Sequence, residues 1–153
     1  MSNRAELRRA MPAMFDHEGW WDGWYRDVDI DGTLLDERRV KTRCEFPDVA
    51  EWHYVQHNWL SWPDGRTATY EFGGRLEGDL LRWETDRFNG FGWQAHEDCL
   101  MLRLDRLDEP GSHYVEMINL VPGAEKRART WQWFRGNEPL KRTLCDEWRI
   151  DAK

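Results

Sequence analysis

The chain has 153 residues, of which 40% are hydrophobic and 33% are charged, and its formal net charge is −7 at pH 7. This length and composition predict one domain with a single hydrophobic core and exclude an intrinsically disordered chain. The negative charge argues against binding to nucleic acid or anionic lipid, which need a basic surface, and no apolar run is long enough for a membrane-spanning helix. We therefore expect a soluble protein with neither a nucleic-acid nor a membrane partner.

Residues 3–15 predict a short amphipathic helix. Leu7, Met11 and Met14 fall on one stripe at helical spacing. Pro12 lies inside this stretch and is expected to end or kink the helix, because proline cannot donate a backbone hydrogen bond. The stretch lacks the apolar run of a signal peptide. We assign residues 1–15 to an N-terminal helical segment that precedes the main domain.

From Trp20 onward, apolar and polar residues alternate with a period of two, which indicates β-strands. Turn sequences interrupt the alternation, among them Asp31-Gly32, Pro63-Asp64-Gly65 and residues 87–90. Short strands of regular spacing predict an all-β fold. We expect a closed antiparallel up-and-down β-barrel of about eight to ten strands with a short N-terminal helix, because closure leaves no exposed strand edge. The predicted strands are 20–30, 33–46, 51–62, 67–76, 80–85, 91–97, 99–107, 113–121, 127–135 and 140–150.

The first of these strands carries a family resemblance. Residues 15–25, FDHEGWWDGWY, resemble the G-x-W-x-G-x-Y opening of lipocalin-like barrels, and residues 54–58, 116–117, 129–136 and 140–149 extend the resemblance in chain order. Together they are similar to an uncharacterised bacterial group of calycins that is distantly similar to the phycobilin lyases. The resemblance implies a lipocalin-like barrel domain over residues 16–153, with a pocket for a small, largely apolar ligand. It implies no single chemistry, because such barrels include carriers, haem binders and enzymes.

Several polar residues occupy positions that the alternation assigns to the barrel interior. An apolar chamber with a few convergent polar groups is typical of a small-molecule site. An arginine there can hold a carboxylate through two hydrogen bonds, and a glutamate with a tyrosine can serve acid–base chemistry. The predicted ligand-binding residues are Arg38, Tyr54, Gln56, Asn58, Glu116, Arg129, Trp131, Trp133 and Glu147.

Two alternatives to this site stay open at the level of sequence. The arginines and glutamates can pair with one another as a buried structural network. A shift of one residue in register would also exchange the inner and outer faces of every strand. The remaining charged runs, such as Arg39, Lys41 and Arg43 and the run at residues 125–127, are predicted to form a solvated outer face.

Metal binding is not expected from the spacing of the candidate ligands. Residues 27–32 match the first half of a calcium loop, but Arg38 stands where a bidentate glutamate is required, so a hairpin turn is the better interpretation. His53 and His57 share a strand face but lie about 13 Å apart, at about 3.3 Å per residue, which is too far for one metal ion. No compact set of Cys and His ligands exists elsewhere.

Haem is a weaker alternative that the resemblance raises. His96 and His113 lie in or beside predicted strands, and either could be an axial ligand. Haem-binding members of the family carry their histidine near the end of the chain, where this sequence has Trp148. We therefore expect no cofactor.

The cysteines bear on the cellular compartment. Cys44, Cys99 and Cys145 are an odd number, are far apart and show no CxxC spacing. This pattern predicts free thiols in a cytoplasmic protein.

Three functions remain open. The first is a binding protein that holds a small hydrophobic or aromatic ligand in the barrel. The second is a cofactor-independent lyase, isomerase or hydratase acting in the same pocket, with Glu116 and Glu147 as the candidate acids or bases. The third is a barrel that acts through protein contacts, and a homodimer is left open.

Overall fold

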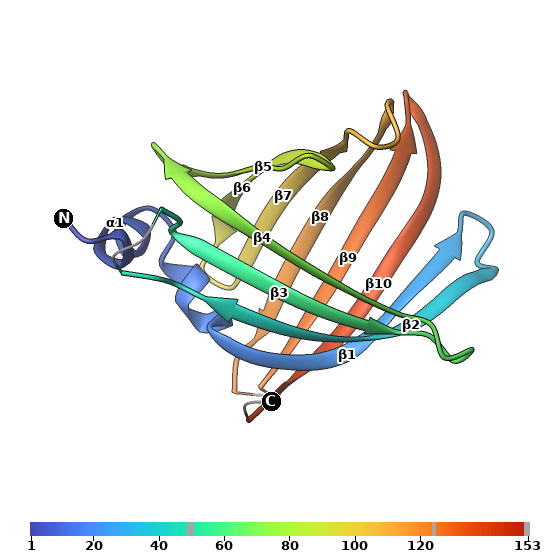
Figure 1. The fold of residues 1–153 in the computed structure, drawn as a ribbon, viewed down its shortest axis with the longest axis horizontal. Coiled ribbons are helices and arrows are strands. Elements are labelled where there is room, and N and C mark those ends of the chain that lie inside the picture. The colour runs from blue at the N-terminus through green and yellow to red at the C-terminus, as the bar shows by residue number, and fades with distance from the viewer. Residues whose placement is uncertain (49–50, 124, 152–153) are drawn as a thin grey trace.

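The computed structural model describes residues 1–48, 51–123 and 125–151 and shows a closed antiparallel barrel of ten strands after a short helical segment (Figure 1). Each strand pairs with its neighbours in the chain, and β1 pairs with β10 to close the barrel. The predicted all-β barrel is confirmed. The strands are β1 (Gly19–Asp29), β2 (Leu34–Glu45), β3 (Tyr54–Ser61), β4 (Thr67–Glu77), β5 (Leu80–Glu84), β6 (Phe88–His96), β7 (Cys99–Arg106), β8 (Ser112–Val121), β9 (Lys126–Arg135) and β10 (Glu138–Ile150).

The helical segment consists of α1 (Asn3–Ala10) and the 3₁₀ helix η1 (Pro12–His17). The Ser2 side chain caps α1 by accepting a hydrogen bond of 3.2 Å from the Ala5 backbone. Pro12 ends the α-helix and begins η1, so the helical part extends two residues beyond the predicted limit at residue 15. Leu7, Met11 and Met14 are buried in one apolar cluster with residues of the barrel. The helical segment therefore closes one end of the barrel (Figure 1).

Five tight hairpins lie at the opposite end. Since the chain enters β1 from the helical segment and reverses at every strand, the turns after β1, β3, β5, β7 and β9 all lie away from α1 (Figure 1). The first of them contains Gly32 at φ 95°, a left-handed conformation that glycine adopts without strain. The predicted Asp31-Gly32 hairpin is thereby confirmed, and the end of the barrel with these hairpins is called the hairpin end below.

One predicted turn is wrong. The sequence predicts a turn at residues 87–90, but β6 begins at Phe88 and only Arg87 lies outside a strand. Thr85 makes the turn instead, because its hydroxyl accepts hydrogen bonds from the backbone N–H groups of Arg87 (3.1 Å) and Phe88 (2.9 Å). Gly90 permits a close approach to β7, since a Cβ there would lie 2.7 Å from the carbonyl oxygen of Arg103.

The hydrogen-bonded ladder is incomplete between β4 and β5. Residues 67–74 of β4 pair with β3, but only residues 75–77 pair with residues 80–82 of β5 within the described chain. Side chains bridge the remaining distance, with the rings of Phe72 and Phe88 5.3 Å apart and the Arg87 guanidinium 4.2 Å from the centre of the Tyr70 ring. We call this unpaired stretch, between residues 67–74 and the β5–β6 hairpin, the seam.

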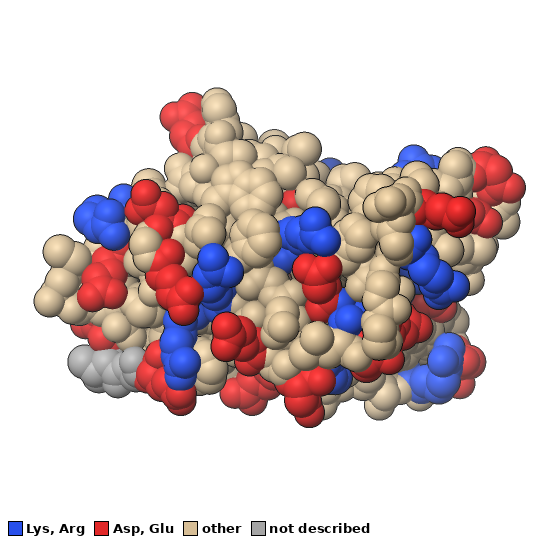
Figure 2. Space-filling model, turned by 90° about the horizontal axis from the view of Figure 1, so that it is seen from above, with Lys and Arg blue, Asp and Glu red and all other residues tan. Residues whose placement is uncertain are grey.

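The outer surface carries paired charges. Acidic and basic side chains lie beside one another over the face seen in Figure 2. On β1 and β2, Arg39 bonds to Asp22 and Arg26 bonds to Glu37. The prediction that Arg39 and Arg43 face solvent is confirmed, with exposed side-chain fractions of 56% and 43%. No helix in the described residues is long and apolar enough to cross a membrane.

Candidate functional site

The barrel contains a cavity of about 420 Å³ that is partly open to solvent. This volume lies within the range of about 300–1,000 Å³ that is usual for small-molecule sites. Its walls are mainly aromatic and aliphatic, and the helical segment contributes Met11, Met14 and His17. Of the predicted site residues, Glu147 lies behind the wall, and those that line the cavity are Arg38, Tyr54, Gln56, Asn58, Glu116, Arg129, Trp131 and Trp133.

Two arginines and two glutamates form a buried cluster at the wall, which we call the inner ion-pair cluster: Glu116, Arg127, Arg129 and Glu147. The Arg129 side chain donates to Glu116 Oε2 through Nε (2.7 Å) and to Glu147 Oε1 (3.3 Å). Arg127 donates to both oxygens of Glu147, at 2.9 Å and 3.3 Å. All four side chains are at most 8% exposed. Two positive and two negative charges balance inside the barrel, as buried charges require.

The two glutamates of this cluster differ in acidity. Burial would raise the pKa of Glu147, but the guanidinium groups of Arg127 and Arg129 outweigh it and hold the pKa below its ordinary value. Burial raises the pKa of Glu116, and Arg129 offsets only part of that effect. Glu147 is therefore the fixed anion, and Glu116 is the more easily protonated carboxyl at the cavity wall.

His17 joins the helical segment to this cluster. Its Nδ1 accepts a hydrogen bond of 3.2 Å from Arg127, which can only donate, so a neutral His17 carries its hydrogen on Nε2. Burial, together with the charges of Arg127 and Arg129, lowers the pKa of His17 well below its ordinary value. His17 is thus a neutral donor inside the barrel.

A chain of polar side chains runs along the inner face of β3. The Tyr54 hydroxyl donates to Gln56 Oε1 (2.5 Å), and the Gln56 amide donates to Asn58 Oδ1 (3.0 Å). Thr42 of β2 also donates to Asn58 Oδ1, at 2.9 Å. These bonds fix the orientation of the predicted β3 side chains along the cavity wall.

Arg38 lies near the hairpin end and is already paired. It donates to Asp27 (3.2 Å) and Asp36 (2.8 Å), and Lys141 also bonds to Asp27 at 3.3 Å. The indole N–H of Trp62 donates to Asp36 (3.1 Å). In this second set of ion pairs, the positive charges of Arg38 and Lys141 balance the negative charges of Asp27 and Asp36, and the bonds hold Arg38 in the cavity wall.

The prediction that residues 125–127 all face solvent is wrong for Arg127, which is 3% exposed. Arg127 has the same strand parity as Arg129, so the alternation already contained the signal that placed it inside. His17, Tyr25 and Asp27 were also missed. Tyr25 accepts a 3.0 Å hydrogen bond from Arg129 and lines the cavity, in the first strand of the G-x-W-x-G-x-Y segment.

Three buried polar atoms of the cavity-lining residues have no hydrogen-bond partner in the described part of the protein: His17 Nε2, Trp83 Nε1 and Trp131 Nε1. The two indole nitrogens can only donate, and the neutral His17 also presents a donor. An unsatisfied buried donor costs about 1–3 kcal/mol. These three atoms are themselves buried within the wall, so the unpaired donors lower the stability of the barrel.

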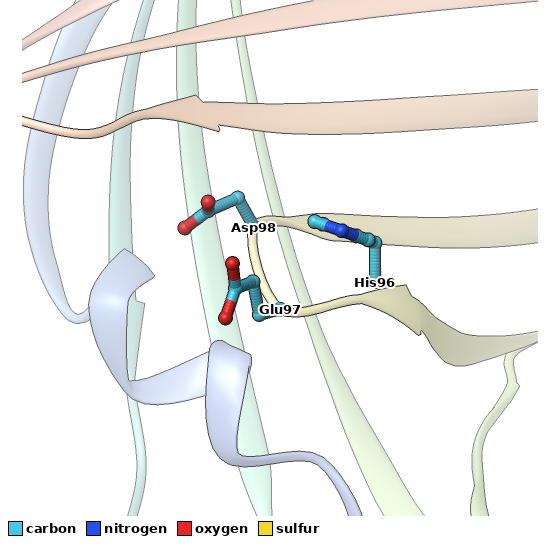
Figure 3. Close-up of side chains that lie close together, drawn as sticks. All are labelled: His96, Glu97 and Asp98. Carbon is cyan, nitrogen blue, oxygen red and sulfur yellow. The ribbon is translucent and has the colours of Figure 1, made fainter.

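The one group of potential metal ligands found in the described residues is His96, Glu97 and Asp98, whose ligand atoms lie within 4.8 Å of one another. Figure 3 shows His96 at the end of β6, with Glu97 and Asp98 on the turn that leads to β7. Three consecutive side chains of an exposed turn approach one another through the chain alone, so their proximity is not evidence for a metal.

The other histidine candidates for metal or haem binding contact carboxylates or an aromatic ring. His53 bonds to Glu6 at 2.8 Å and accepts from the Leu76 backbone at 3.2 Å. His57 lies 3.5 Å from Glu45 and Glu71. His113 stacks on Phe134, with ring centres 5.1 Å apart.

Solved structures share this fold. The S-type phycobiliprotein lyase CPES from Guillardia theta superposes with a TM-score of 0.71 at 13% identity, covering 99% of this chain and 98% of the lyase. A protein of unknown function in the DUF3598 family, from Nostoc punctiforme PCC 73102, has a TM-score of 0.62 at 14% identity over 90% of this chain. The chain spans about half of that protein, 49% of its length. The fold is a closed antiparallel barrel that is distantly similar to the barrel of this phycobiliprotein lyase. No protein-family model and no curated protein matches the sequence.

The geometry is suited to holding a molecule. The inner ion-pair cluster and the β3 chain supply a rigid polar framework, and the aromatic walls supply apolar contact area. Rigid walls bind with little loss of conformational entropy, because their side chains are already ordered.

Proposed function

We propose that the protein binds a small, largely apolar or aromatic molecule in the barrel interior. The observation that carries this proposal is the cavity of about 420 Å³, which is lined mainly by aromatic and aliphatic side chains with a few polar groups among them. A molecule with an apolar body would remove the apolar area of these walls from water. The fold likeness to a phycobiliprotein lyase adds a phycobilin to the compounds worth testing.

Tryptophan fluorescence tests the proposal, because Trp83, Trp131 and Trp133 line the cavity. Titration with dodecanoic acid and with a phycobilin should quench the emission saturably for at least one of them. Leu104→Trp, which fills the cavity, should abolish the saturable signal, whereas Leu107→Trp at a position 45% exposed should retain it. The proposal would be wrong if every compound quenched the tryptophan emission linearly, and to the same extent in both variants.

A second candidate, an enzyme without a cofactor, draws support from Glu116. Its carboxyl lies at the cavity wall, and burial raises its pKa, as a general acid at neutral pH requires. Mass spectrometry of the bound compound after incubation separates the two functions. An enzyme changes the mass of the compound and loses that activity in Glu116→Gln, whereas a carrier returns it unchanged.

We also place the protein in the cytoplasm, as its thiols suggest. Cys44, Cys99 and Cys145 are unpaired, and Cys44 and Cys145 are buried. Free thiols are stable in the reducing cytosol.

A further inference from the structure

The cavity wall contains more arginines than the inner ion-pair cluster holds. Arg127 and Arg129 are paired with Glu116 and Glu147, as described. Towards the hairpin end, Arg38 is paired with two aspartates, and Arg106 donates to both oxygens of Asp108 at 2.6 Å and 2.7 Å. The arginines that line the cavity are Arg38, Arg87, Arg106, Arg127 and Arg129.

Arg87 differs from the other four, because its guanidinium has no hydrogen bond or ion pair with any residue in the described ranges. It stacks on Tyr70 with 4.2 Å from the guanidinium carbon to the ring centre, and it lies 5.8 Å from the ring of Phe88. Asp108 is near enough to interact with its charge, but both Asp108 oxygens already accept from Arg106. An aromatic face orients a guanidinium while leaving its N–H edge free for a planar anion.

The position of Arg87 gives it access to both solvent and cavity. It lies in the β5–β6 turn, half-buried, and contacts Tyr70 across the seam, where β4 pairs with β3 but not with β5. Tyr70 is itself 37% exposed and lines the cavity. A ligand held here can bury its body in the barrel while its charged end remains at the seam.

The inner ion-pair cluster is a poor place for an anion by comparison. The Arg129 side chain is committed to Glu116, Glu147 and Tyr25. A carboxylate arriving there would face two buried carboxylates of the same sign with no free positive charge.

We propose that the ligand is an amphipathic acid whose carboxylate is bound by Arg87 at the seam and whose apolar body lies between the aromatic walls. This inference rests on the proposed function, since it names the ligand class for the same cavity. It assigns the acid to Arg87 and not to Arg129, because Arg129 is neutralised within the protein.

The test compares dodecanoic acid with its methyl ester, using tryptophan fluorescence on the full chain. The wild-type protein should bind the acid about tenfold more tightly than the ester, as expected for a hydrogen bond to a charged group that is partly screened by water. Arg87→Met should reduce this ratio to about twofold while leaving ester affinity nearly unchanged, because methionine keeps much of the apolar stem. Arg103→Met is the matched control: it removes one charge from a side chain that is 43% exposed, paired with Asp105 and absent from the cavity lining, and should keep the wild-type ratio.

The outcomes separate the two proposals. Binding of neither compound to the wild-type protein would overturn the proposed function and this inference with it. Binding of both, with a ratio that survives Arg87→Met or with equal losses for acid and ester, would overturn the Arg87 assignment alone. Circular dichroism checks that the variants fold, and Arg87→Gln provides the same comparison if the methionine variant is unstable.

Discussion

His17 and the inner ion-pair cluster show how charge is accommodated inside the barrel. Arg127 bonds to Glu147 and His17, and Arg129 bonds to Glu116, Glu147 and Tyr25, so each buried charge meets an opposite one. Removing one member of such a set typically costs about 3–5 kcal/mol, because the partner remains buried without compensation. Substitutions in this cluster therefore test stability before they test ligand binding.

The first prediction concerns the pH dependence that His17 creates. The folded protein keeps His17 neutral because burial and the neighbouring arginines lower its pKa, whereas the unfolded chain protonates it near its ordinary value of 6.5. Unfolding thus takes up a proton below about pH 6.5, and the free energy of unfolding falls as the pH decreases, by at most about 1.4 kcal/mol per pH unit. Urea denaturation at several pH values between about 7 and 5.5 should show this loss.

Variants separate His17 from other titrating groups. Glu116 acts in the opposite direction, since burial raises its pKa and its contribution to stability declines as the pH rises. We therefore compare slopes: His17→Gln should lose less stability than the wild type on acidification, and His96→Gln, at an exposed turn, should follow the wild type. Parallel slopes for His17→Gln and the wild type would show that His17 is not protonated on unfolding.

At the level of elements, η1 and the residue that joins it to α1 form the floor of the cavity. Met11 and Met14 line it, whereas Leu7 is fully buried in the same cluster without reaching it. The helical segment therefore has two roles, closing the barrel and limiting the length of the cavity, and these roles fall on different residues.

The second prediction separates these roles. Met14→Ala should enlarge the cavity and shift preference from dodecanoic acid toward tetradecanoic acid, at a stability cost of about 2–5 kcal/mol. Leu7→Ala should cost a similar amount but leave the chain-length preference unchanged, because Leu7 does not line the cavity. Fluorescence titration with both acids, beside urea denaturation, measures the two effects. An unchanged preference in Met14→Ala would show that the floor does not limit the ligand.

Strand parity predicted much of the site, and the rest depended on packing between elements. Tyr54, Gln56 and Asn58 could be placed inside because alternation along one strand fixes which residues share a face. His17 could not, since it lies in a 3₁₀ helix whose burial depends on where the helical segment meets the barrel. Arg127 was not predicted to lie inside, because the charged run that contains it indicates a solvated face. A buried arginine is nevertheless stable when Glu147 lies opposite.

At the scale of the whole molecule, the barrel is unevenly closed. β1 pairs with β10 over residues 20–29 and 141–150, and β9 pairs with β10 along most of its length. By contrast, β4 pairs with β5 only over residues 75–77, and β5 is the shortest strand of those described. This arrangement could not be predicted from strand lengths in the sequence, because residues 67–76 carry a normal strand pattern, and only the three-dimensional structure shows that residues 67–74 pair with β3 alone.

The third prediction follows from this asymmetry. Regions with few ladder hydrogen bonds open locally at lower free energy, so their amides exchange sooner with deuterated water. Peptides covering residues 80–88 should exchange before peptides from β9 and β10, which are paired on both sides.

If a ligand bridges the cavity and Arg87, dodecanoic acid should slow exchange in residues 80–88 more than in β9 or β10, because it adds contacts where the ladder is missing. Mass spectrometry of peptic fragments measures both effects, and the methyl ester is the control, since it fills the cavity without the charged contact. Exchange of residues 80–88 as slow as that of β10 in the free protein would show that side-chain packing alone, through Phe72 and Phe88, keeps the seam closed.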